Sequence, residues 1–443
     1  MAEDSKKFQL QKVDEPVLYR DMFPYTELPK VLFEDSTLPL APAKEIWITD
    51  TTFRDGQQAR PPYTVEQIVD VYKLMAKLDG GSGIIRQSEF FIYSKKDRQA
   101  VEKCLETGAQ FPQVTSWIRA VKSDFALVKS MNLPETGILT SCSDYHIFLK
   151  LHKDRRQAME LYLDIARSAL EEGIVPRCHF EDITRADVYG FVVPFAIELM
   201  KLREQSGMDV KIRLCDTMGY GVPWPEATLP RSVPKLVHAM IHDAGVPGEL
   251  LEFHGHNDFH KVLINPATAW LYGCSSCNAS LLGIGERTGN SPLEAMIIEA
   301  AQLRELVPCS DKIKFEVITE IANYFRDEIG HDIPTNFPII GRDFNTTRAG
   351  IHADGLLKSE EIYSAFDTQK ILHRPIAVAI TDKSGAAGLK HWLERYHGVD
   401  VPKNDPRLLS IRDKVDVEYE AGRTTAISDD ELQLWYDEAF GKK

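Results

Sequence analysis

The residues with the clearest chemistry are His254 and His256, two imidazoles separated by a single glycine. They follow a short, largely apolar run that ends at Phe253, and such a run favours a strand. Side chains two residues apart on a strand point to the same side, so both rings would reach one point, as a metal site requires. A purely structural or surface role for the two histidines explains the spacing equally well.

A carboxylate about two hundred residues upstream favours the metal site. Residues 50–56 read Asp-Thr-Thr-Phe-Arg-Asp-Gly and supply Asp55. Two histidines and one carboxylate leave positions open on a divalent metal, and such a metal acts as a Lewis acid on a carbonyl oxygen. This set therefore suits a substrate with a polarised ketone.

Three further side chains offer hydrogen bonds to a substrate carboxylate, and the clamp would consist of Arg54, Arg119 and Thr217. A metal beside a carboxylate clamp suits a 2-oxo acid, because its ketone and carboxylate chelate together. Ion pairs at the rim remain the alternative for the two arginines, and a capping hydroxyl for Thr217.

The bulk composition excludes several classes of protein. A chain of 443 residues with 43% hydrophobic and 27% charged residues is typical of a globular protein of about two to three domains. Its net charge of −14 argues against a nucleic-acid binder, and its longest apolar runs are too short to span a membrane. With no signal-peptide pattern, we expect a cytoplasmic protein whose seven cysteines, including the lone Cys274-x-x-Cys277 pair, are reduced thiols.

Apolar, β-rich runs alternate with amphipathic stretches in the middle of the chain, which predicts parallel strands joined by helices. Eight such units match the size of a (β/α)8 TIM barrel. A doubly wound sheet is the competing fold, but no glycine-rich dinucleotide fingerprint follows the first strand. The expected strands are 46–55, 83–91, 113–120, 135–143, 175–183, 210–217, 250–258 and 277–285.

We predict three parts: an N-terminal arm (1–45), a TIM-barrel catalytic domain (46–307) and a smaller, mainly helical C-terminal subdomain (308–443). Catalytic groups of such barrels lie at the C-terminal ends of the strands. Seven of the eight expected strands here end in polar residues. A capping or turn role could explain one such end, but it does not explain seven at the same rim. The set includes Arg54, Asp55, Arg119, His146, Glu181, Thr217, His254 and His256.

These residues also match motifs of a known family. The chain resembles the metal-dependent acyl-CoA condensing synthases on TIM barrels, which include the 2-isopropylmalate, homocitrate, citramalate and Re-citrate synthases. Residues 50–58 are similar to the family's D-T-T-L-R-D-G-x-Q opening, residues 283–290 to its G-x-G-E-R-x-G segment, and residues 179–182 to its S-x-E-D signature with His179 in place of serine. The resemblance implies that Asp55, His254 and His256 bind a divalent metal (Mn, Co, Mg or Zn). It also implies that Arg54 contacts the oxo acid.

The tail separates synthases from lyases of the same superfamily. Residues 350–355 (Gly-Ile-His-Ala-Asp-Gly) resemble a synthase element that the lyases lack, and Tyr363 follows His352 at the synthase spacing. The resemblance implies that His352, Glu181 and Tyr363 take a proton from the methyl group of the co-substrate acetyl-CoA. A carbon–carbon lyase and a non-catalytic barrel are the alternatives from other classes.

The acceptor is expected to be oxaloacetate, giving citrate after thioester hydrolysis. The arm, the 85–91 strand and the proline-rich 219–234 loop resemble the Re-citrate synthase subgroup. Ile284 and His260 replace an Asn and a Gly that are usual in the family, and Arg86 would bind a second substrate carboxylate, with His146 also in the pocket. Homocitrate synthase is the first alternative, and 2-isopropylmalate or citramalate synthase the next. The arm and the family suggest a homodimer, with no nucleic-acid or membrane partner.

Overall fold

The computed structural model describes residues 8–303, 306–307 and 310–441. The chain forms two compact units, Met1–Lys314 and Phe315–Lys443. The first unit holds both the predicted arm and the predicted barrel, and it ends a few residues beyond the predicted boundary at 307. Each unit is described by itself.

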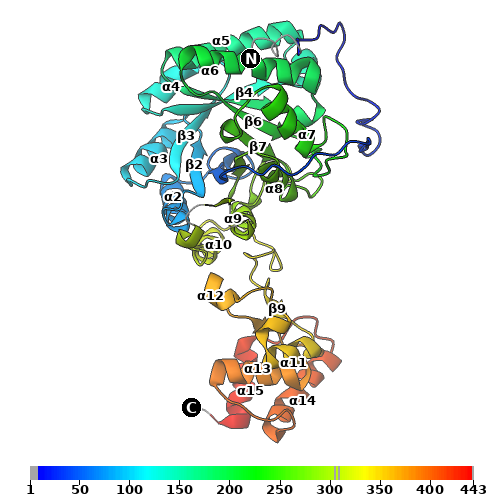
Figure 1. Ribbon diagram of the computed structural model, residues 1–443. Coiled ribbons are helices and arrows are strands. Elements are labelled where there is room, and N and C mark those ends of the chain that lie inside the picture. The colour runs from blue at the N-terminus through cyan, green and yellow to red at the C-terminus, as the bar shows by residue number, and fades with distance from the viewer. Residues whose placement is uncertain (1–7, 304–305, 308–309, 442–443) are drawn as a thin grey trace. The chain divides into compact units, whose positions relative to one another are not determined.

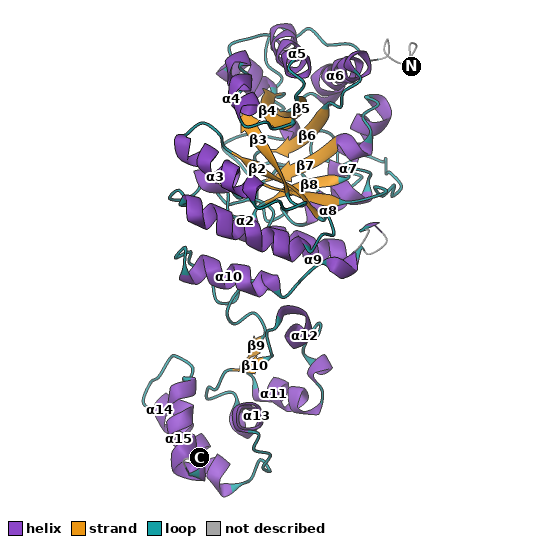
Figure 2. Ribbon diagram, turned by 90° about the vertical axis from the view of Figure 1, so that its left-hand side faces the viewer, coloured by secondary structure: helices purple, strands orange, loops and turns teal. Residues whose placement is uncertain are grey.

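The first unit is built around a closed barrel of eight parallel strands in chain order, which confirms the predicted TIM barrel. β1 closes the barrel by pairing with β8. Figure 2 shows the strands of this unit in orange, with helices around them. Every strand is shorter than predicted, because the polar residues that follow it leave the ladder. The strands are β1 (Trp47–Asp50), β2 (Ile85–Phe90), β3 (Gln113–Ile118), β4 (Glu135–Ser141), β5 (Val175–Glu181), β6 (Lys211–Asp216), β7 (Leu251–Gly255) and β8 (Ser276–Ala279).

Helices surround the barrel and connect its strands (Figure 1). Three of them begin at reciprocal capping boxes, formed by Thr64 with Gln67, Ser94 with Asp97 and Asp154 with Gln157. Such boxes satisfy two backbone N–H groups that the first turn leaves unpaired. The helices are α1 (Asp55–Gln58), α2 (Val65–Asp79), α3 (Lys95–Glu106), α4 (Phe125–Ser130), α5 (Arg155–Glu171), α6 (Val193–Ser206), α7 (Val233–His238), α8 (Ile264–Leu271) and α9 (Leu293–Gln302).

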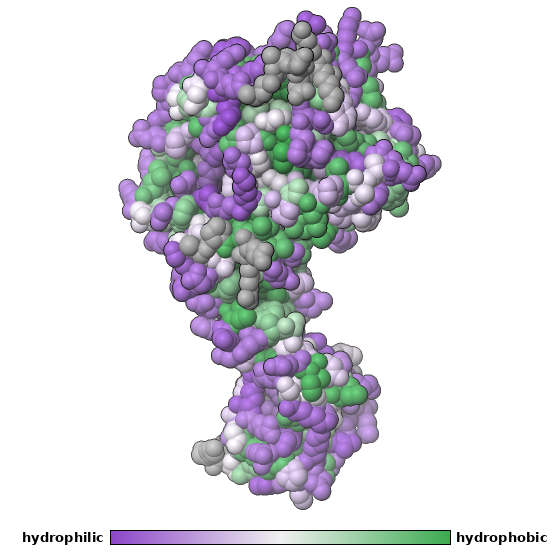
Figure 3. Space-filling model, in the orientation of Figure 1, coloured by the Kyte–Doolittle hydropathy of each residue, from purple (hydrophilic) through white to green (hydrophobic). Residues whose placement is uncertain are grey.

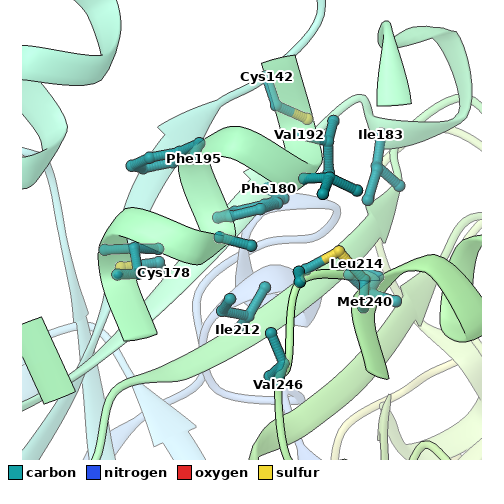
Figure 4. Packing of buried hydrophobic residues seen from close by; sticks show 14 of the residues in the cluster. Cys142, Cys178, Phe180, Ile183, Val192, Phe195, Ile212, Leu214, Met240 and Val246 are labelled. Carbon is teal, nitrogen blue, oxygen red and sulfur yellow. The ribbon is translucent and has the colours of Figure 1, made fainter. Parts of the chain in front are cut away.

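Alternation along β5 separates an apolar layer from a polar one. Phe180 faces outward and stacks on Phe195 of α6, with ring centroids 5.0 Å apart (Figure 4). Its neighbours in sequence face the barrel interior, where Arg177 and His179 lie close to Glu89 of β2. The apolar core therefore lies between strands and helices, while the interior of this barrel carries buried charges.

The N-terminal arm, dark blue in Figure 1, runs over the outside of the barrel unit. Its described residues form no helix, and their only regular pairing is a single bridge between Phe33 and Ala227. Hydrogen bonds hold it: the backbone N–H of Val17 donates to Asp144, and that of Ala43 to the carbonyl of Trp270. The arm is extended, as predicted.

The second unit is mainly helical, as predicted, with a two-stranded parallel sheet of β9 (Thr346–Thr347) and β10 (Ala377–Val378). Its own core includes Leu389, Trp392 and Leu408. Hydrophilic side chains cover most of the face shown in Figure 3, and none of the described helices is long and apolar enough to cross a membrane. The helices are α10 (Val317–Asp327), α11 (Gly350–Lys358), α12 (Thr368–Leu372), α13 (Gly385–His397), α14 (Pro406–Glu420) and α15 (Asp429–Phe440).

Candidate active site

The structure brings the three predicted metal ligands together. Ligand atoms of Asp55, His254 and His256 all lie within 4.8 Å of one another, and all three residues are buried. His254 lies on β7 and His256 directly after it, so the alternation of the strand aims both rings at one side, with their Nε2 atoms 3.1 Å apart. Asp55 comes from helix α1, five residues beyond the end of β1.

The hydrogen-bond partner of His254 fixes its tautomer. Nδ1 of His254 lies 2.7 Å from the side-chain oxygen of Asn278, whose amide nitrogen donates to the carbonyl of Thr49. Because Asn278 must turn its oxygen toward the ring, Nδ1 carries the hydrogen and Nε2 keeps its lone pair. The lone pair therefore points at His256 and Asp55, which is the orientation that a metal ligand needs.

The surroundings also favour the protonation states that bind metal. Burial and, after it, the neighbouring His256 lower the pKa of His254 to about 3, so the imidazole is neutral at pH 7. For Asp55, burial raises the pKa, but the positive charge of Arg54 and the two imidazoles outweigh this and lower it overall. A carboxylate and two neutral imidazoles are the donor set of a divalent transition metal.

Arg54 joins the ligand set to the charged interior of the barrel. Its Nε donates to Oε1 of Glu89 at 2.8 Å and its Nη1 donates to Oδ1 of Asp55 at 3.1 Å. Its guanidinium also lies 5.7 Å from the ring of Trp117. With Nε and Nη1 held, the plane of the guanidinium is fixed beside the ligands.

A pocket of about 270 Å³ opens over this set. Besides the three predicted ligands, Arg54, Trp117, Glu181 and Thr217 are among the residues that line it. The Thr217 hydroxyl accepts from the backbone N–H of Asp182 at 2.9 Å. The volume suits a small acid with a few polar contacts.

Glu181 is one of three carboxylate residues that line the pocket, and three side chains surround it. Ser141 donates a hydrogen bond to its carboxylate, Nδ1 of His146 lies 3.0 Å from Oε2, and Nζ of Lys150 lies 3.2 Å from it. Burial raises the pKa of Glu181, but these neighbours outweigh burial and lower it to about 2. Glu181 is therefore ionised and accepts hydrogen bonds at neutral pH.

Three predicted substrate contacts are not found at this pocket. Arg86 lies near the start of β2, with the parity opposite to Glu89, where it donates to Glu45 at 2.5 Å and stacks on Trp47. Arg119 follows β3 at the rim, but Asp124 engages both ends of its guanidinium. This pair is the ion pair at the rim that the sequence analysis gave as the alternative to a substrate contact.

The third of these residues, His146, contacts Glu181 and lies 3.7 Å from Asp182, outside the pocket lining. It thus supports a pocket residue instead of lining the pocket. His260 is exposed with a φ of 56°, a backbone conformation that favours the glycine usual in the family.

The remaining predicted catalytic residues lie in the second unit. His352 is on α11, its Nδ1 3.2 Å from the Thr347 hydroxyl, and its ring centroid lies 4.2 Å from that of Tyr363. Tyr363 is 47% exposed, so both rings are available to an incoming group. Within its own unit, the structure brings this predicted pair together.

Sequence reasoning missed three polar residues around the ligands, Glu89, Asn278 and Asn290. Asn290 donates to Oδ2 of Asp55 at 2.7 Å, and its side-chain oxygen is buried without a hydrogen-bond partner among the described residues. Asn290 is the last residue of the 283–290 segment, so the family motif could have pointed to it. Asn278 carried no signal of its own, because its role follows only from the pairing of β7 with β8.

Comparison with known proteins agrees with this geometry. The family model HMGL-like matches residues 45–325. A citrate (Re)-synthase of Syntrophus aciditrophicus (strain SB) is 60% identical over 96% of this chain and 68% of its own length. A citrate (Re)-synthase of Clostridium kluyveri is 54% identical over 98% of this chain and 96% of its own length.

More distant relatives share the architecture. A 2-phosphinomethylmalate synthase of Streptomyces hygroscopicus is 35% identical over 97% of this chain and 98% of its own length. Among solved structures, a Bacillus subtilis HMG-CoA lyase matches 67% of this chain and 97% of its own, with a TM-score of 0.52 and 16% identity. That likeness shows the barrel fold alone.

Proposed function

The chain belongs to the HMGL-like family, and from this premise we propose that it condenses acetyl-CoA with oxaloacetate and hydrolyses the thioester to release citrate. The observation that carries this function is the identity of 60% and 54%, over nearly the whole chain, to two citrate (Re)-synthases. The chain is thus an acyltransferase that uses acetyl-CoA, and we propose attack on the Re face by the same relationship.

Asp55, His254 and His256 would hold a divalent cation, which supplies Lewis-acid chemistry at the ketone when bound. The fixed Nε2 lone pair of His254 supports this role. The two imidazole ligands favour Mn²⁺, Co²⁺ or Zn²⁺ over Mg²⁺, which prefers oxygen ligands.

Arg54 donates hydrogen bonds to the ketone oxygen of oxaloacetate, where negative charge develops as the new carbon–carbon bond forms. Thr217, which lines the same pocket, binds the adjacent carboxylate. Because Glu89 and Asp55 already fix the guanidinium of Arg54, its remaining N–H groups meet the substrate with little loss of side-chain freedom.

We propose that His352, with Tyr363 beside it, takes the proton of the acetyl methyl group, and that Glu181 also has a role in the proton transfer. The ring contact of His352 with Tyr363 and its position in the 350–355 segment support these roles. The low pKa of Glu181 assigns it the part of a hydrogen-bond acceptor that orients other groups, since a carboxylate with a pKa of about 2 is a weak base.

We also propose a cytoplasmic homodimer. Large apolar side chains are concentrated on the arm: Tyr25 is 91% exposed, Leu28 81% and Phe33 60%, and Phe33 stacks against the half-exposed Trp224. Apolar groups gathered at one surface are typical of a surface that another protein covers. A second copy of this chain is the partner that we propose for it.

Release of free CoA thiol from acetyl-CoA tests this function. Oxaloacetate, 2-oxoglutarate, 2-oxoisovalerate and pyruvate are compared, each with and without divalent metal. We expect turnover only with oxaloacetate and metal, and we expect Asp55→Ala and His254→Ala to abolish it. His242→Ala, an exposed histidine on the outside of the barrel, is the matched control.

Two results would contradict the proposal. Faster thiol release with 2-oxoglutarate than with oxaloacetate would make the chain a homocitrate synthase. Near wild-type turnover of Asp55→Ala would remove the metal assignment.

A further inference from the structure

The turn that follows β4 carries two basic side chains to the same carboxylate. His146 and Lys150 both lie on the π-helical turn η3 (Tyr145–Lys150). Nζ of Lys150 lies 3.3 Å and 3.2 Å from the two oxygens of Glu181, and Nδ1 of His146 lies 3.0 Å from one of them. The same two basic groups lie 3.4 Å from each other.

The wide turn explains why both residues face one way. In η3 the backbone N–H of Leu151 donates to the carbonyl of His146, five residues earlier. At this pitch, residues four apart lie nearly above each other, so His146 and Lys150 share one face. Such turns are rare in proteins, and those that occur are often found at functional sites.

Neither basic residue lines the pocket, whereas Glu181 does. The side chain of Glu181 is 17% exposed and that of Lys150 is 50% exposed, so Lys150 approaches the carboxylate from the solvent side. The two residues therefore reach the reaction only through Glu181.

The other groups around Glu181 do not replace them. On β4, Ser141 supplies one neutral hydrogen bond, and the Cys142 thiol donates to the backbone carbonyl of Glu181. The hydroxyl of Tyr162 on α5 accepts from the backbone N–H of Ser141, and among the described residues no hydrogen bond joins it to the Glu181 carboxylate. Asp182 adds a further negative charge nearby, which Arg185 partners, and Cys215 of β6 is a buried neutral thiol.

We propose that His146 and Lys150 are positioning residues that hold the Glu181 carboxylate ionised and aimed into the pocket. The inference rests on the proposed condensing function, in which Glu181 is a hydrogen-bond acceptor of the pocket. A mostly buried carboxylate without these partners would take up a proton and lose its place as an acceptor.

The pH profile of kcat/KM tests the proposal in Lys150→Met, which keeps the length of the side chain and removes its charge. We expect the acid limb to move up by about one pH unit or more, because Glu181 loses its nearest permanent cation. We expect kcat to fall about tenfold, with the KM for oxaloacetate within about twofold. Lys150→Arg should restore both.

The matched control is Lys122→Met. Lys122 has a similar exposure of 54% and pairs with Asp164, away from the pocket. Its profile should match the wild type. Combining Lys150→Met with Glu181→Gln should add no further loss, because the lysine acts only through that carboxylate.

A Lys150→Met enzyme with an unmoved acid limb would overturn the proposal, and so would a full additional loss in the Glu181→Gln background. A titration that needs no turnover separates this from the proposed function. Carbon-13 NMR of the glutamate carboxyl carbons, with the Glu181 signal assigned by its loss in Glu181→Gln, should show a higher pKa in Lys150→Met. An unchanged pKa overturns the proposal, whichever substrate the enzyme accepts.

Discussion

At the level of single residues, the orientation of the proposed metal ligand His254 depends on a neighbour that no motif contains. Asn278 of β8 fixes the ring of His254, and the carbonyl of Thr49 on β1 fixes Asn278. The chain of contacts ends in the backbone of the barrel, which does not rotate. The ligand ring is therefore set before any metal arrives.

We predict that Asn278→Ala weakens metal binding by roughly 10–100-fold, because losing a partner of this kind frees the ring and its tautomer. Calorimetric titration of metal-free protein with Mn²⁺ measures the change directly. His260→Ala, which alters an exposed histidine outside the ligand set, should bind as the wild type does. Unchanged affinity in Asn278→Ala would show that the other ligands alone orient the ring.

The sequence predicted which ligands meet but not which polar residues support them. Asp55, His254 and His256 could be found because their chemical types and the strand period are written in the chain. The contacts of Glu89 and Asn278 depend on which strands become neighbours when the barrel closes. A shift of one residue along a strand also turns the side chain from the barrel interior to the outside. Arg86 shows this, since it lies three residues before Glu89 and faces the other way.

At the level of elements, helices were easier to predict than strand ends. The α2 and α5 helices each begin at a capping box and carry an amphipathic stripe, and both signals are local in the sequence. β1 ends at Asp50, well before the predicted Asp55. There the backbone N–H groups of Arg54 and Gly56 turn back to the carbonyl of Thr51 instead of joining a neighbouring strand.

Helix α9 supplies a prediction about stability and pH. Glu294 lies in its first turn, fully buried, where its carboxylate accepts from the backbone N–H of Leu282. Burial raises its pKa from the ordinary value of 4.5 to about 7. A pKa raised by folding means that the folded state prefers the protonated form, so stability falls as pH rises from about 4.5 to 7 and stays low above that.

We therefore expect Glu294→Gln to gain stability relative to the wild type as pH rises. The difference in unfolding free energy between mutant and wild type should be larger at pH 8 than at pH 5 by roughly 2 kcal/mol. Urea unfolding at both values measures it. Glu299→Gln on the same helix, where the side chain is partly exposed, is the control, and a pH-independent difference for Glu294→Gln would contradict the burial argument.

At the level of the whole molecule, buried ion pairs occupy the interior of the barrel. Glu89 lies between Arg54 and Arg213, and Arg213 also pairs with Glu252. Burial raises the pKa of Glu89, but the arginines and His179 lower it well below the usual range. Paired charges of this kind are tolerated inside a protein only when each has its partner, so the strands that supply them constrain one another.

The division into two units separates the proposed metal ligands from the proposed base His352 and its neighbour Tyr363. All three ligands and Asn278 lie in Met1–Lys314, whereas His352 and Tyr363 lie in Phe315–Lys443, which has its own apolar core. We predict that a chain truncated after Lys314 folds and binds Mn²⁺ as tightly as the whole protein but releases no CoA thiol from acetyl-CoA and oxaloacetate. Circular dichroism checks the fold, and calorimetry checks the metal.

Full-length His352→Ala is the companion variant, because it keeps the second unit and removes only the proposed base. It should also bind metal normally and lose most turnover. The rest of the fold should stay unchanged. Equal loss in both variants places the contribution of the second unit largely in His352. A truncated chain that still turned over would place the whole reaction in the barrel unit, and a well-folded one without metal affinity would mean that the ligand set needs more than the barrel.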